Sequence, residues 1–169
     1  MDDAERLIRA YRVRPDQSVI RKLDILMDLE RFSDPSVVSL LVQVVLDRDE
    51  PAEARLRAVR QLRDRSHTVD DPGPVADALG RVLGDRANLE LRLQAALALA
   101  DFTEVAGVIA VLGAVALDAG EPLDLRYSAF TSLERAGPSP QIGGLLHQLA
   151  GDEALGQSAR ALLARWRLA

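Results

Sequence analysis

Cysteine is absent from this 169-residue sequence, which excludes disulfide bridges, thiolate zinc sites and a cysteine nucleophile. Histidine occurs only at His67 and His147, far apart in the chain, so neither a metal site nor an acid–base pair is expected. No run approaches the roughly 18 apolar residues of a membrane span, and the polar, acidic start lacks the apolar core of a signal peptide. We therefore expect a cytoplasmic protein with no cofactor, metal or membrane partner.

Aromatic residues make up only 4% of the chain, and lysine occurs once, at Lys22. Leu, Ala, Val and Arg dominate instead, and because helix-preferring residues outweigh strand-preferring ones we expect an all-α protein. The preference for arginine over lysine is typical of a GC-rich, bacterial genome. With 26 acidic and 21 basic residues the net charge is −5, which disfavours nucleic acid as a partner. The length favours a single domain over residues 1–169.

A repeat becomes visible when the segments starting at residues 34, 71, 103 and 138 are aligned. Three columns then recur with the same spacings of 38, 33 and 34 residues: Val37, Val75, Val108 and Ile142; Leu41, Leu79, Leu112 and Leu146; and Asp47, Asp85, Asp118 and Asp152. Apolar residues follow helical spacing within each unit. Each unit is thus predicted to start with an amphipathic helix that ends near the aspartate.

The second half of each unit has its own columns. They are Ala54, Leu91 and Leu125; Arg55, Arg92 and Arg126; Ala58, Ala95 and Ala129; and Leu62, Leu99 and Leu133. These columns predict a second helix whose small alanines allow close helix packing. The sequence therefore predicts an α-α superhelix of about five helical hairpins with irregular terminal units.

The pattern Ala-Arg-Leu-Arg-Ala-Val-Arg-Gln-Leu at 54–62, its counterpart at 91–99 and the turn aspartates resemble the HEAT repeat, over about residues 17–163. The resemblance is strongest to short bacterial HEAT-like repeats of the phycobilisome-lyase type. It implies a structural ladder in which turn aspartates (Asp47, Asp85, Asp118) pair with second-helix arginines (Arg55, Arg92, Arg126). It also leads us to expect irregular end units: Met27 loosely matches the Leu62 column, and a degenerate last hairpin ends in Trp166.

No group of side chains in the sequence has the composition of a catalytic site. The hypothesis is therefore a protein that is not an enzyme, namely a scaffold or adaptor that binds another protein. The phycobilisome-lyase resemblance leaves an alternative, an enzyme or accessory subunit of that group. Fold alone does not decide between them.

A helical wheel places the partner-binding surface on the outward side of the second helices, the concave side in HEAT-like arrays. The candidate binding residues are Arg57, Arg60, Leu93, Gln94, Leu97, Tyr127 and Thr131. Arg57 and Arg60 are expected to face solvent. Two interpretations of the apolar members stay open, a protein interface or packing between second helices. The segment 66–71 is a second candidate surface, and a monomer is expected, with a homodimer left open.

Overall fold

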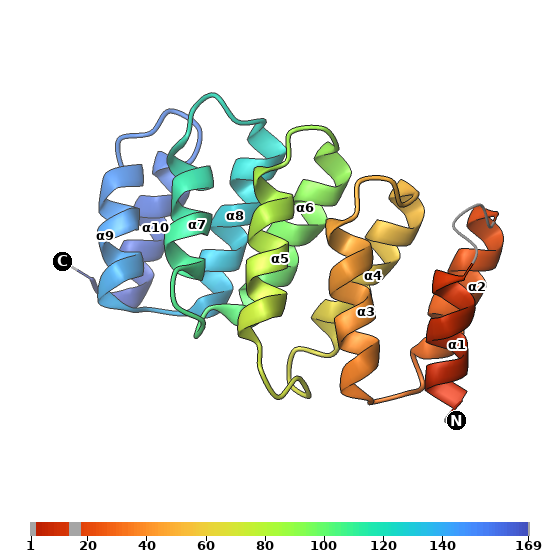
Figure 1. Ribbon diagram of the computed structural model, residues 1–169. Coiled ribbons are helices and arrows are strands. Elements are labelled where there is room, and N and C mark those ends of the chain that lie inside the picture. The colour runs from red at the N-terminus through yellow and green to blue at the C-terminus, as the bar shows by residue number, and fades with distance from the viewer. Residues whose placement is uncertain (1–2, 14–17, 169) are drawn as a thin grey trace.

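The computed structural model describes residues 3–13 and 18–168, and these ranges contain helices and no strands. The α-helices, shown in Figure 1, are α1 (Asp3–Arg12), α2 (Val19–Leu29), α3 (Pro35–Leu46), α4 (Ala52–Asp64), α5 (Gly73–Gly84), α6 (Leu89–Ala98), α7 (Val108–Leu117), α8 (Leu123–Ala136), α9 (Pro140–Leu149) and α10 (Gly156–Trp166). A short 3-10 turn, η1 (Leu99–Phe102), follows α6. The predicted limits of the domain, residues 1 and 169, lie outside the described ranges.

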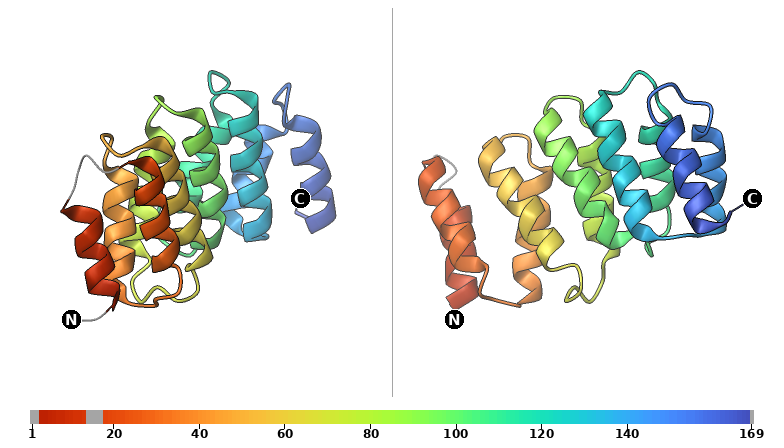
Figure 2. Two further views of the ribbon diagram at one scale, coloured as in Figure 1. Left: turned by 90° about the vertical axis from the view of Figure 1, so that its right-hand side faces the viewer. Right: turned by 180° about the vertical axis from the view of Figure 1, so that it is seen from behind.

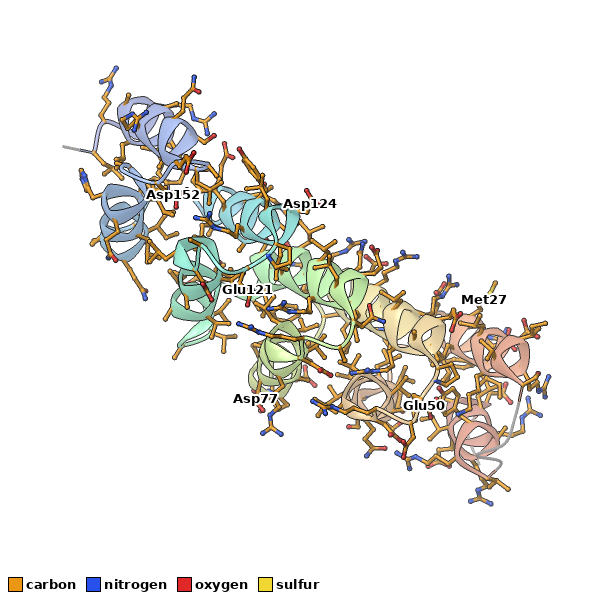
Figure 3. All side chains as sticks on the ribbon, turned by 90° about the horizontal axis from the view of Figure 1, so that it is seen from above. Met27, Glu50, Asp77, Glu121, Asp124 and Asp152 are labelled. Atoms are coloured by element: carbon orange, nitrogen blue, oxygen red, sulfur yellow. The ribbon has the colours of Figure 1, made fainter. Side chains whose placement is uncertain are left out.

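Successive helices form five antiparallel hairpins that stack side by side (Figures 1 and 2). The first helices, α1, α3, α5, α7 and α9, form one layer, and the second helices, α2, α4, α6, α8 and α10, form the other, as the view along the helices shows (Figure 3). The prediction of an all-α, HEAT-like array of five hairpins is confirmed. No helix in the described part is long and apolar enough to cross a membrane.

The predicted apolar columns form the core between the two layers. Leu41, Leu79, Leu112 and Leu146 have no exposed surface, and the alanine column of the second helices is equally buried. Several helix starts have a side-chain cap. At α3, Asp34 accepts a hydrogen bond from the backbone N–H of Ser36, and Pro35 follows as the first helical residue. Local sequence and packing therefore specify the same register.

The first hairpin follows the repeat more regularly than the sequence indicates. Lys22 is the fourth residue of α2, as Arg55 is of α4, so Leu29 and not Met27 occupies the Leu62 column. Leu29 is fully buried, whereas Met27 is 53% exposed. The predicted match of Met27 is therefore wrong by two residues.

At the other end of the array, α9 packs closely on α7 because α7 has glycine at the contact. A Cβ atom at Gly113 would lie 2.7 Å from the side chain of Leu145, closer than packed carbons approach. The Trp166 ring in α10 is half-buried and packs against the core, as expected for the end of the array.

Candidate partner-binding surface

The predicted binding residues come from three second helices and lie on one layer of the molecule. We call the outward side of α2, α4, α6, α8 and α10 the second-helix surface. Figure 3 shows that the labelled Met27 of α2 and Asp124 of α8 both project from it, whereas Asp77 of α5 projects from the opposite layer. Arg60 and Thr131 are exposed, and Leu97 is half-buried.

An apolar row crosses this surface at the fifth residue of α2, α4, α6 and α8. Its members are Leu23, Leu56, Leu93 and Tyr127. Leu56 and Leu93 are half-buried and pack partly against the core, whereas Tyr127 is 40% exposed. The two interpretations, a protein interface and packing between second helices, are therefore compatible. The members of the row pack partly against the core and still present apolar surface to solvent.

The structure contradicts the expectation that Arg57 faces solvent. Its side chain is only 31% exposed, and its guanidinium lies 2.8 Å from the carboxylate of Glu30, just beyond α2. The Arg57 Nε atom is buried without a hydrogen-bond partner. Arg57 therefore links α4 to the preceding hairpin. Of the two predicted binding arginines, Arg57 and Arg60, only Arg60 is open to a partner.

A groove between α8 and α10 extends the surface at its C-terminal end. Its volume is about 400 Å³, and the predicted residues Tyr127 and Thr131 line it together with Phe130 and Leu162. The Tyr127 hydroxyl donates to the backbone carbonyl of Ala154 (3.2 Å). Gln94 donates a hydrogen bond to Glu90, one turn earlier in the same helix (3.1 Å).

Buried polar side chains fix the spacing of neighbouring second helices. Gln61 in α4 donates to the carbonyl of Leu26 in α2 (2.7 Å), and Ser132 in α8 donates to the carbonyl of Ala96 in α6 (2.8 Å). Both carbonyls lie in the last turn of an α-helix, where carbonyls lack regular intrahelical donors. The second-helix surface is therefore held by specific hydrogen bonds as well as by apolar packing.

The predicted arginine column is buried and structural. Arg55, Arg92 and Arg126 each donate from Nε to a backbone carbonyl at the end of the first helix in the same hairpin, at 2.7 to 3.0 Å. Each side chain thereby satisfies a carbonyl that the helix itself leaves without a donor. These bonds tie the two layers within one hairpin.

The predicted ladder of turn aspartates and second-helix arginines is confirmed only at Arg126, whose partner Asp152 belongs to the turn-aspartate column of the next unit. Arg92 forms two hydrogen bonds with Glu121, at 2.7 and 2.8 Å, and Arg126 pairs with Asp152 at 2.6 Å. Lys22 forms the equivalent contact with Glu50 at 2.8 Å. Each acid belongs to the next hairpin, and Figure 3 shows Glu50, Glu121 and Asp152 along the array.

These pairs also perturb the acids electrostatically. The hydrogen bonds from the Arg92 side chain lower the pKa of Glu121 below its ordinary value, against the opposing effect of burial. The backbone N–H of Leu155, followed by the Arg126 side chain, lowers the pKa of Asp152. Both carboxylates are therefore stabilised in the charged form that the pairs require.

The turn aspartates have another role. Asp47, Asp85 and Asp118 each accept a hydrogen bond from the backbone N–H two residues later, which shapes the turn. Asp85 and Asp118 do link neighbouring hairpins, but through the exposed turn arginines Arg48 (3.3 Å) and Arg86 (4.0 Å). The predicted pairing of these aspartates with Arg55, Arg92 and Arg126 is therefore wrong.

Arg55 has no acidic partner within 4.0 Å in the described part of the chain. Glu-Pro precedes the second helix in two turns, at Glu50-Pro51 and Glu121-Pro122, whereas the turn between α5 and α6 is one residue shorter and ends in Asn88. Asn88 caps α6 by accepting from the N–H of Leu91 (2.9 Å). The two Glu-Pro pairs are the sequence signal for two of the three acids that pair with a basic side chain of the preceding hairpin, Glu50 and Glu121.

The two histidines remain far apart, since His67 lies between α4 and α5 and His147 lies in α9. In the described ranges, no three His, Asp or Glu side chains are grouped so that they could hold a metal ion.

No protein-family model matches the chain, and no curated protein matches it significantly. Among solved structures it is similar to that of human deoxyhypusine hydroxylase in complex with glycerol, with 15% sequence identity and a TM-score of 0.36. The similarity covers 97% of this chain and 84% of the other. At these values the likeness concerns only the helical fold.

The similar structure bears the name of an enzyme, and this finding contradicts the expectation that the chain is not an enzyme. We withdraw that expectation. The likeness transfers no reaction to this chain either, because a shared fold does not define a site.

Proposed function

We propose that this protein binds another protein along its second-helix surface. The observation that carries the proposal is the apolar row Leu23, Leu56, Leu93 and Tyr127, which repeats on four successive second helices. Scattered apolar residues on a surface are ordinary, but a row at equivalent positions offers a partner a continuous strip. Exposed Ile20 and Met27 add to this strip on α2.

The polar residues around the strip also suit a protein partner. Arg60 lies in the middle of the array, while Glu53, Glu90 and Asp124 occupy equivalent second positions of α4, α6 and α8. An apolar centre with a charged margin of both signs is the usual composition of a protein interface. Tyrosine and arginine contribute most to such interfaces when binding removes them from water.

The test is capture of partners from the source organism, followed by titration of the recovered protein with wild type and variants. We expect the double variant Arg60→Glu, Tyr127→Ala to bind more than tenfold more weakly, which corresponds to about 1.4 kcal/mol. Arg60 is exposed, so its change should leave the melting temperature nearly unchanged. Tyr127→Ala also removes the hydrogen bond to the Ala154 carbonyl, so the melting temperature of each single variant is measured beside its affinity. Arg57 is excluded from this test because its loss would also break the pair with Glu30.

The matched control is Asp77→Ala, which alters an exposed side chain on the opposite layer. The control should bind like wild type, and equal affinity of the double variant would contradict the proposal. The alternative drawn from the sequence, a role of the phycobilisome-lyase type, predicts binding of a bilin. Titration with a free bilin, followed by absorbance, tests that alternative on the same preparation.

A further inference from the structure

A large cavity lies in the other layer, between α3, α5 and the segment 65–72. Its volume is about 580 Å³, within the roughly 300 to 1,000 Å³ typical of small-molecule sites. Valine side chains from all three segments provide its apolar lining: Val38, Val42, Val69 and Val75. In Figure 1 the segment 65–72 is the yellow loop that descends from α4 and returns to α5.

The cavity coincides with an insertion in the repeat. The columns are 38 residues apart between α3 and α5 but 33 and 34 residues apart in later units, and the extra residues fall in this segment. Insertions in repeat arrays lie in loops on one face, which is often a binding face. The segment is anchored, since Val69 packs against the core and Asp71 accepts a hydrogen bond from the N–H of Gly73 (3.1 Å).

The charge at this cavity is negative. Asp70 and Asp71 line it, and in the ranges that the structure covers neither carboxylate has a basic side-chain nitrogen within 4.0 Å. Arg65 also lines the cavity, but its guanidinium donates to the carbonyls of Leu29, Glu30 and Phe32, at 2.7 to 3.1 Å. The one arginine of the lining is thus occupied with the end of α2.

A neighbouring cleft between α5 and α7 provides a comparison. Its volume is about 310 Å³, and its acid, Asp77, is paired with Arg81 at 3.1 Å. Both clefts have apolar walls, but only the one next to the insertion combines them with unpaired carboxylates.

We propose that the α3/α5 cavity binds a small organic cation, a primary amine on an apolar body. The apolar body would contact the valines of the lining, and the ammonium would lie near the exposed carboxylates of Asp70 and Asp71, where its charge is complementary. A carboxylate on the same body would be repelled. This site is independent of the second-helix surface, so either proposal can fail alone.

The test uses three probes with the same six-carbon body: hexylamine, hexan-1-ol and hexanoate. Each is titrated into the full chain while the valine methyl resonances are followed by NMR. Hexylamine should bind most tightly and shift the four cavity valines, and hexanoate should bind most weakly. Asp70→Asn with Asp71→Asn should weaken hexylamine binding about fivefold, as expected for exposed charge pairs, and leave hexan-1-ol unchanged.

Two further variants keep the outcome interpretable. Ser39→Trp places a large ring at the exposed rim of the cavity without disturbing the core, and it should reduce hexylamine binding at least tenfold. Val111→Trp, beside the α5/α7 cleft, should have no effect. Equal binding of hexylamine and hexanoate, shifts confined to valines elsewhere, or unchanged binding by Ser39→Trp would each overturn the proposal.

Discussion

The two helix layers of this protein are built in different ways. Neighbouring second helices are joined by side-chain bonds, from Gln61 to Leu26 and from Ser132 to Ala96, and by the pairs of Arg57 with Glu30 and Arg135 with Asp101. The first helices instead enclose apolar clefts on both sides of α5. One layer therefore presents a surface held by polar bonds, with a groove of about 400 Å³ between α8 and α10, and the other contains the larger cavity, of about 580 Å³.

This difference shows how one repeat can supply two kinds of site. A surface that spans several hairpins requires a fixed spacing between them, because a partner must meet each helix in register. A cavity requires the opposite, a place where neighbouring helices do not close on each other. The inserted segment 65–72 covers such a place between α3 and α5.

The largest expected effect lies in the core that the two layers share. Leu112→Ala, and equally Leu41→Ala or Leu79→Ala, should lower the free energy of unfolding by about 2 to 5 kcal/mol, the usual cost of truncating a buried leucine. Urea denaturation measures it. A cost below about 0.5 kcal/mol at all three positions would contradict the repeat register.

The next effect tests the bonds between hairpins. Arg92→Ala should cost about 3 kcal/mol because it leaves the nearly buried carboxylate of Glu121 with only the longer contact to the exposed Arg86 (3.6 Å). Arg55→Ala should cost only about 1 kcal/mol, since its main loss is one hydrogen bond to the carbonyl of Val45. Equal costs for the two variants would show that the acidic partner contributes nothing.

A smaller effect concerns the second-helix layer alone. Ser132→Ala leaves the carbonyl of Ala96 without this donor and should cost about 1 to 2 kcal/mol. Asp77→Ala, on the other layer, breaks only an exposed pair within one helix and should cost less than about 0.5 kcal/mol. Thermal unfolding of both variants beside wild type separates the two expectations.

The sequence predicts the architecture well because helical periodicity and a repeat of constant spacing report the same register. Leu41, Leu79 and Leu112 are buried as their column requires. The sequence predicts the contacts between hairpins poorly, because these contacts depend on which turn lies beside which helix. Glu121 follows the predicted aspartate Asp118 by three residues. Only the packed array shows that Glu121, and not Asp118, reaches Arg92.

Two other features depend on details that periodicity does not contain. The role of Arg57 follows from the position of Glu30, and the misplaced Met27 register gave no reason to bring these residues together. The α3/α5 cavity exists because the inserted segment packs through Val69 and leaves a space beneath it. A loop length alone predicts neither the packing nor the space.

Hydrogen exchange of the protein, free and bound to its captured partner, tests the central claim most directly because it reports each helix separately. The account predicts that binding slows exchange in α4, α6 and α8, around Arg60, Leu97 and Tyr127, and leaves α3, α5 and the segment 65–72 unchanged. Protection confined to α3, α5 and that segment would contradict it and assign partner binding to the first-helix layer.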